Sequence, residues 1–181
     1  LLGPEDSGLV VEAAPGEKPV LYGGRRVDGW VKEGDRFYAA RLPEFPQFGE
    51  EPGRAEQPRD WDVQMLLVDG QMAPLARFPE TGTLNHVSSF DVPWMSSTGG
   101  GWKQKPTPAE LTTMKYKAGD LGPWLEATNA QVTVYHMWDE SRVGVARHDA
   151  ASQLLFFSSP LGHPPGAFGV KKYVVWNIRE G

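Results

Sequence analysis

The chain has 181 residues and a net charge of −5, and its lack of cysteine excludes disulfides and thiolate metal sites. Without a block of Lys and Arg, this charge argues against nucleic acid as a partner, and no apolar run approaches the roughly 20 residues of a membrane span. Gly (21) and Pro (16) break helices and favour turns, so together with seven Trp they predict an all-β domain with long loops.

The first part of the chain predicts short strands separated by turns. Apolar runs at residues 9–13 and 19–22 flank a Pro-Gly turn, and a third strand is expected within residues 36–42. Residues 43–60 are rich in proline and charge, and we expect them to form a loop. Asp69-Gly70 then predicts a hairpin with a type I′ turn, because both central residues of that turn need positive φ.

Residues 79–110 show no regular period, yet they contain Phe90, Trp94 and Trp102. An irregular stretch of this length is usually functional or disordered, and three large aromatic residues fit disorder poorly. One helical turn is expected to start in "PAELTTMKY", and a short turn is expected around Trp124. Strands are predicted to close the chain at residues 131–137, where apolar and polar residues alternate, and at residues 142–147, 153–158 and 171–178.

Four segments stand in an order that matches a known family. They are "VEAAPGEKPVLYGGRRVDGW", "LLVDGQMAPLARFPE", "HMWDESRVGV" and "YVVWNIREG". In this order they resemble segments of bacterial right-handed parallel β-helix proteins that act on carbohydrates, which include glycoside hydrolases, polysaccharide lyases and binding modules. In several of these proteins a β-sandwich-like domain is inserted between early turns of the β-helix.

The resemblance implies that residues 1–29 are β-helix-type strands and that residues 30–181 are an inserted domain, incomplete at its C-terminal end. The expected fold is therefore all-β, with short parallel β-helix turns followed by a mostly antiparallel sandwich or barrel with long loops. The family's catalytic residues lie in later β-helix turns, so none can be carried over to this chain. An extracellular or periplasmic location is also implied.

Loop aromatics are the candidate carbohydrate-binding residues. Trp94 and Trp102, with Trp124, offer flat faces on which the C–H groups of a sugar ring can pack. Polar neighbours that could bind sugar hydroxyls are His86, Asn85 and Lys103. The alternative is that these aromatics fold back and pin the long loop onto the sheet, since most Trp side chains are largely buried.

The stretch Trp138-Asp139-Glu140 offers two carboxylates beside an aromatic ring. Adjacent residues on a strand point to opposite faces, so these acids do not form the facing pair that glycoside hydrolysis needs. We interpret Trp138 as core packing and the acids as part of a turn with an ion pair to Arg142. The alternative is that one of the acids binds a sugar hydroxyl.

Other catalytic or cofactor chemistry has little support in the sequence. The four histidines, His86, His136, His148 and His163, lack the spacing of a metal site. No G-x-S-x-G motif is present, and the run Gly99-Gly100-Gly101 lacks the context of a phosphate loop. We therefore expect no metal, no cofactor and no catalytic residue within this chain.

The expected function is a non-catalytic carbohydrate-binding or substrate-shaping domain, with a xylan-type glycan as the first ligand to test. One alternative is the N-terminal fragment of a glycosidase or polysaccharide lyase. Another is a structural insertion that mediates contacts between protomers. Residues 9–13 and 171–178 are expected to leave unpaired strand edges, which favours self-association.

Overall fold

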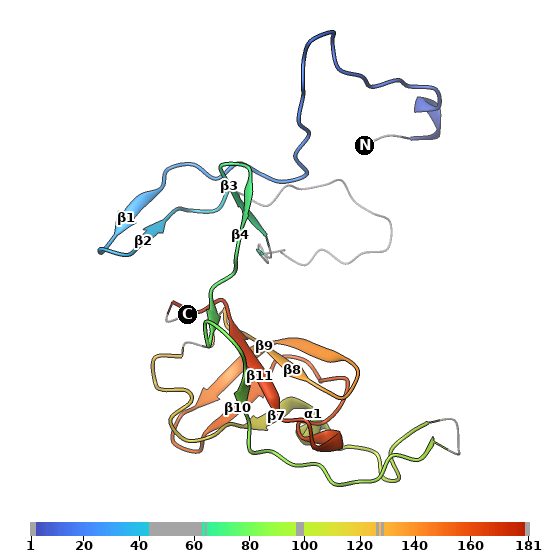
Figure 1. Cartoon of the computed structure of the whole chain (residues 1–181), viewed down its shortest axis with the longest axis vertical. Coiled ribbons are helices and arrows are strands. Elements are labelled where there is room, and N and C mark those ends of the chain that lie inside the picture. Colours follow the sequence, from blue (N-terminus) through green and yellow to red (C-terminus); the bar gives the residue numbers. More distant parts are fainter. Residues whose placement is uncertain are drawn as a thin grey trace. The chain divides into compact units, whose positions relative to one another are not determined.

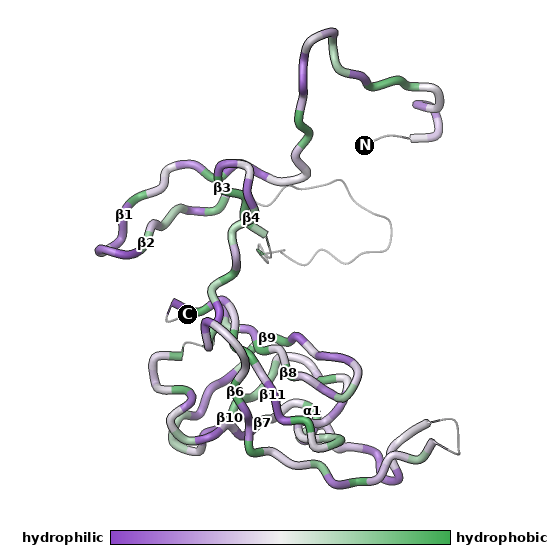
Figure 2. Tube along the Cα trace, viewed as in Figure 1, coloured by the Kyte–Doolittle hydropathy of each residue, from purple (hydrophilic) through white to green (hydrophobic). Residues whose placement is uncertain are grey.

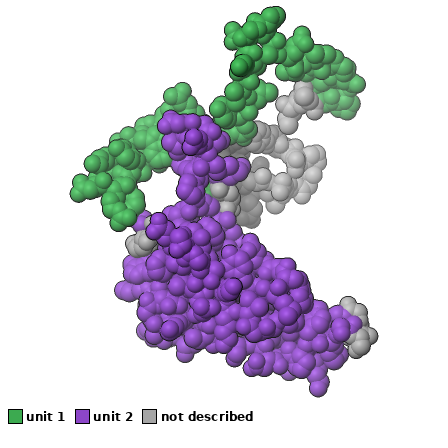
Figure 3. All heavy atoms as spheres, viewed as in Figure 1, with its two compact units in different colours: residues 1–63 green, residues 64–181 purple. Residues whose placement is uncertain are grey.

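The computed structural model describes residues 3–43, 63, 65–96, 100–125, 127 and 129–179. The chain divides into two compact units, Leu1–Val63 and Gln64–Gly181 (Figure 3). The predicted boundary after residue 29 rests on the family resemblance and stays a prediction. Most of the predicted loop at residues 43–60 lies outside the described residues.

The first unit has little regular structure. It contains a 3₁₀ turn η1 (Pro4–Asp6) and a hairpin of β1 (Val31–Glu33) and β2 (Phe37–Ala39). Hydrophobic residues recur along it (green in Figure 2), yet none of residues 3–43 is buried. Residues 9–13 and 19–22 pair with no strand of the described chain, so the strands predicted there are absent.

The second unit begins with the predicted hairpin. Its strands are β3 (Leu66–Val68) and β4 (Gln71–Ala73), paired antiparallel. At the turn, Asp69 and Gly70 have φ angles of 51° and 76°. Positive φ at both positions is what the Asp-Gly sequence predicts for a type I′ turn.

Seven further strands form one antiparallel sheet in the order β5-β11-β8-β9-β10-β7, with β6 also beside β11 (Figure 1). This confirms a mostly antiparallel, all-β architecture, and the four predicted closing strands appear as β8 to β11. The strands are β5 (Arg77–Phe78), β6 (Leu84–Asn85), β7 (Thr113–Lys115), β8 (Gln131–Tyr135), β9 (Glu140–Asp149), β10 (Leu154–Phe157) and β11 (Lys172–Trp176).

Strand β11 lies inside the sheet rather than at its edge. Tyr173 pairs with Val134 of β8 on one side and with Leu84 of β6 on the other. The prediction of an unpaired edge at residues 171–178 is therefore wrong. Its partners β5 and β6 are two-residue strands inside an irregular stretch, too short to give a strand pattern in the sequence.

The backbone that follows β6 connects the two ends of the sheet. The His86 N–H donates to the Lys171 carbonyl beside β11 at 2.9 Å, and the Val87 N–H donates to the Lys115 carbonyl of β7 at 2.8 Å. The Lys115 N–H in turn donates to Ser88 Oγ at 2.8 Å. The sheet thus curls into a barrel, one of the two architectures that the sequence left open.

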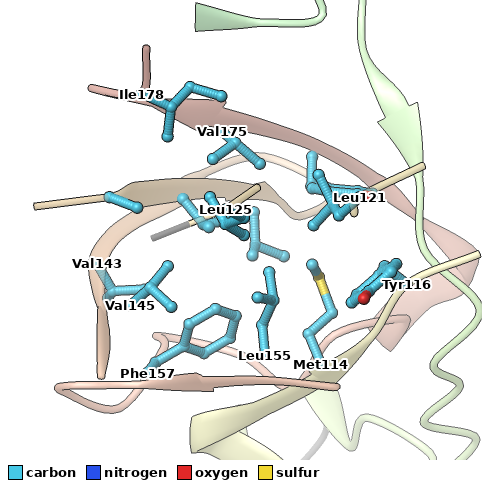
Figure 4. Close-up of a cluster of buried hydrophobic side chains, with 14 of the residues drawn as sticks. Met114, Tyr116, Leu121, Leu125, Val143, Val145, Leu155, Phe157, Val175 and Ile178 are labelled. Carbon is cyan, nitrogen blue, oxygen red and sulfur yellow. The ribbon is translucent and has the colours of Figure 1, made fainter. Parts of the chain in front are cut away.

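The barrel interior is filled by alternate residues of the strands. Figure 4 shows Val175 and Ile178 pointing toward Met114, Leu155 and Phe157 from the opposite side of the core. This alternation is the two-residue period of a strand, in which successive side chains point to opposite faces. The burial of aliphatic and aromatic side chains in the barrel interior is the main favourable contribution to the stability of this unit.

Short helical pieces lie outside the sheet of the second unit. The predicted helical turn is α1 (Pro108–Thr112), preceded by a capping box in which the Thr107 N–H donates to Glu110 Oε2 at 2.7 Å. The 3₁₀ turn η3 (Ala167–Gly169) follows Gly166 in the connection from β10 to β11.

Gly166 provides a test of how tightly this connection packs on the barrel-closing segment. A Cβ added at Gly166 (φ 88°) would lie 2.5 Å from the Ser88 carbonyl oxygen, whereas one at Gly169 (φ 74°) would meet nothing within 4 Å. Both alanine variants carry left-handed strain of about 1–2 kcal/mol, and Gly166→Ala adds the backbone clash.

We expect Gly166→Ala to lower the free energy of unfolding by about 3 kcal/mol or more, and Gly169→Ala by only about 1 kcal/mol. Urea unfolding followed by tryptophan fluorescence measures both variants. Equal losses in the two variants would contradict the close packing of Gly166 against Ser88.

Candidate functional site

Five aromatic side chains from three separate segments meet at one place in the second unit. We call Trp94, Trp102, Trp138, His163 and Phe168 the aromatic cluster. The centroids of the Trp102 and Trp138 rings each lie 4.9 Å from the centroid of the Phe168 ring. The centroids of the Trp94 and Trp102 rings are also 4.9 Å apart. The His163 ring lies 5.8 Å from both Trp94 and Trp102.

Trp94 and Trp102 face each other across a narrow antiparallel bridge. The Met95 N–H donates to the Gly101 carbonyl at 2.7 Å, and the Lys103 N–H donates to the Pro93 carbonyl at 2.9 Å. The apparently irregular loop is thus hydrogen-bonded at its base. The two indoles stand edge-to-face at 86°, so they make a packed pair rather than the flat platform that the sequence suggested.

Phe168 is held in an unusual backbone conformation at the centre of the cluster. Its φ is 58°, in the left-handed region that bulky residues rarely adopt. Such strain persists only where surrounding contacts fix it, and it is frequent at functional sites. Here the strained backbone places the Phe168 ring between Trp102 and Trp138.

Trp138 is the exposed member of the cluster, with 61% of its surface accessible. Its interpretation as a core residue is therefore wrong. Strand β8 ends at Tyr135, and Trp138 lies in the turn that leads to β9. Strand alternation, which predicts inward and outward residues, does not apply in a turn.

A carboxylate stands next to the exposed indole. Asp139 Oδ2 lies 3.8 Å from His163 Nε2, and the Asp139 side chain is 43% exposed. Among the described residues, the expected ion pair between this turn and Arg142 is not formed. Arg142 Nε instead donates to the Gln131 amide oxygen, and its guanidinium group lies over the Trp176 ring. Asp139 thus keeps accessible oxygen atoms that could accept hydrogen bonds from hydroxyl groups.

Ser141 and His136 lie beneath this turn. His136 Nε2 is 3.1 Å from Ser141 Oγ, which also accepts a hydrogen bond from the Gly162 N–H at 2.9 Å. Burial lowers the pKa of His136, while Asp139 opposes that shift and His163 adds to it. The nearby carboxylate contacts the other histidine, so these groups do not form a Ser-His-Asp relay.

A groove of about 580 Å³ adjoins the cluster through Phe90. The Phe90 ring meets Trp102 edge-to-face at 5.0 Å. The charged and polar residues that line the groove are Ser89, Asp91, Lys103, Gln104 and Glu110. Hydrogen bonds from the backbone and hydroxyl of Thr107 lower the pKa of Glu110, which keeps this carboxylate ionised.

His86 and Trp124, also candidate site residues from the sequence, lie elsewhere. His86 is only 2% exposed, so it does not stand at an accessible rim, and Trp124 packs edge-to-face on Phe78 at 5.5 Å beside the core. Conversely, His163 and Phe168 were missed. The only signal for them was a Gly- and Pro-rich stretch with interspersed aromatic rings, at residues 160–169.

The His86 ring is buried, and neither of its nitrogen atoms has a hydrogen-bond partner among the residues that the structure describes. Burial lowers its pKa to about 4, and the positive charge of Lys171 adds to the shift. The Ser88 carbonyl opposes the shift but does not reach hydrogen-bonding geometry. His86 is therefore neutral at neutral pH and acts as an interior residue.

Comparisons with family models, curated proteins and solved structures found no match to this chain. The resemblance to β-helix proteins therefore stays a prediction. Among the described residues, no three His, Cys, Asp or Glu side chains are arranged to hold a metal ion. No helix in that part of the chain has the length and apolar character to cross a membrane.

The low pKa of His86 predicts a loss of stability in mild acid. The unfolded chain binds this proton near pH 6.5 and the folded chain only near pH 4, so protons favour the unfolded state between these values. Lowering the pH from 7 to 5 should then reduce the free energy of unfolding by about 2 kcal/mol through His86.

Urea unfolding at the two pH values measures this loss. His86→Phe keeps a ring beside Tyr173 but does not titrate, so it should show about 2 kcal/mol less acid destabilisation than the unmodified protein. The same pH dependence in both proteins would show that His86 is not its source.

Proposed function

We propose that the aromatic cluster binds a carbohydrate chain, and that this protein is a non-catalytic carbohydrate-binding or substrate-shaping domain of a secreted bacterial polysaccharide-active protein. The observation that carries the proposal is the exposed Trp138 ring followed in the chain by the accessible Asp139 carboxylate, with both side chains near His163. An indole face suits the C–H groups of a sugar ring, and a carboxylate suits its hydroxyls.

The surrounding residues support this role for Trp138. Its ring is held by Phe168 at 4.9 Å and by Trp94 at 6.4 Å. A side chain already fixed in this way loses little rotamer freedom when a ligand binds. The groove beside Phe90 offers Asp91, Lys103 and Gln104 to further hydroxyl groups of an extended chain.

A second candidate is a protein contact between protomers. Met137 and Trp138 are 59% and 61% exposed and adjacent in the same turn. Met and Trp are both enriched in protein interfaces. The two candidates differ in what Trp138 contacts, so the same substitution tests both. The reading as an enzyme fragment concerns residues outside this chain and stays a prediction.

Trp138→Ala should weaken glycan binding about tenfold or more, if stacking on an aromatic ring is worth roughly 1–3 kcal/mol as it is for nucleic-acid bases. The melting temperature should change little, because the ring is exposed. Calorimetric titration with xylan oligosaccharides, followed by a panel of other neutral glycans, measures this effect.

Trp30→Ala is the matched control, because Trp30 is 47% exposed and lies in the first unit, outside the cluster. It should leave binding unchanged. Binding that survives Trp138→Ala would contradict the proposal. If instead Trp138→Ala abolishes a concentration-dependent dimer seen by sedimentation, and no glycan in the panel binds, the protein-contact candidate is favoured.

A further inference from the structure

The outer face of the sheet carries two arginines around one tryptophan. Val175 points into the core (Figure 4), so its strand neighbour Trp176 faces outward. The guanidinium carbons of Arg77 on β5 and Arg142 on β9 lie 5.2 and 5.1 Å from the centroid of the Trp176 ring. The indole N–H donates to Thr133 Oγ1 at 2.9 Å, which fixes the ring against the sheet.

Among the described residues, both guanidinium groups are hydrogen-bonded only to neutral oxygen atoms. Arg77 Nη2 donates to the Gly82 carbonyl at 2.6 Å, and Arg142 Nε donates to the Gln131 amide oxygen at 2.8 Å. Within the described residues, neither arginine forms an ion pair with a carboxylate. Two like charges therefore lie on one ring without an ion pair, in a chain whose net charge is −5.

Packing alone does not explain the charged ends of these side chains. Thr133 and Val174, on the same face, are 2% and 0% exposed. The aliphatic stems of the arginines can shield Thr133 and Val174 from solvent, but apolar side chains without a guanidinium group would shield them equally well. Arg142 is exposed, and both of its Nη atoms are without a partner among the described residues.

We propose that Arg77 and Arg142 bind the carboxylate groups of an acidic, uronate-containing saccharide on this outer face. A guanidinium donates two parallel N–H bonds to a carboxylate, a geometry that a point charge does not provide. Trp176 acts as a positioning residue, because stacking fixes both guanidinium planes. The Tyr135 ring, on the neighbouring strand β8, is partly exposed and can pack against a sugar ring. It therefore favours a saccharide over a peptide as the source of the carboxylate. This inference rests on the proposed carbohydrate-binding function and adds the charge of the ligand.

The test compares two ligands of equal length, an oligogalacturonate and the corresponding neutral galacto-oligosaccharide, by titration of the full chain at low salt. The unmodified protein should bind the acidic ligand at least tenfold more tightly. Arg142→Gln should remove most of that preference, about a tenfold change, with an unaltered melting temperature. Arg142→Lys keeps the positive charge but lacks the two parallel N–H donors of a guanidinium group, so it should retain only part of the preference for the acidic ligand.

Arg147→Gln is the matched control, because Arg147 lies on the same strand but stacks on Phe156 at 3.6 Å. It should keep the full preference. Equal binding of the two ligands by the unmodified protein, or an unchanged preference in Arg142→Gln, would overturn the inference. Equally strong competition by polyglutamate would overturn the assignment to a saccharide.

Trp138→Ala separates this site from the aromatic cluster. If that variant loses binding of the neutral ligand but keeps an Arg142-dependent preference for the acidic one, both proposals are supported. Arg142-dependent binding of the acidic ligand alone, unaffected by Trp138→Ala, supports the outer-face site and contradicts the cluster as a glycan site.

Discussion

The barrel depends on the pairing of residues 84–88 with both ends of the sheet. Leu84 and Asn85 pair with β11, and the Val87 N–H reaches the Lys115 carbonyl of β7. Without this segment, β7 and the outer side of β11 would leave backbone donors and acceptors unpaired beside a hydrophobic core, which is costly. The closure also draws the His86 ring into the interior, where the cost of burying a polar ring without a partner appears as its low pKa.

The strands that could be predicted are those whose own residues show a strand pattern in the sequence. Apolar and polar residues alternate in residues 131–135, so a strand there followed from the period of two. Strand β11 shows no such alternation, because Tyr173, Val174 and Val175 are all buried, and it was recognised only as an apolar run of strand length. The position of β11 inside the sheet did not follow, because its second neighbours are β5 and β6. Strands of two residues carry no period, and their pairing is decided by contacts distant in sequence.

The candidate site was predictable only in part for the same reason. Trp94 and Trp102 could be selected as aromatic residues in an irregular stretch, but their edge-to-face packing depends on a bridge that no local pattern specifies. Trp138 was misassigned because alternation was extended past the end of β8 at Tyr135. Phe168 reaches the cluster through a left-handed backbone conformation that its residue type disfavours.

The β8–β9 hairpin relates the two proposed binding surfaces to each other. Its turn carries Trp138 and Asp139, while its outer face carries Arg142, opposite Thr133 in the register. A fixed antiparallel register leaves little freedom between residues only a few positions apart along a strand. A saccharide that reached from the turn onto the outer face would therefore meet an aromatic surface and a carboxylate-binding surface held at a constant spacing. One rigid hairpin could then combine stacking, which tolerates many sugars, with charge, which selects among them.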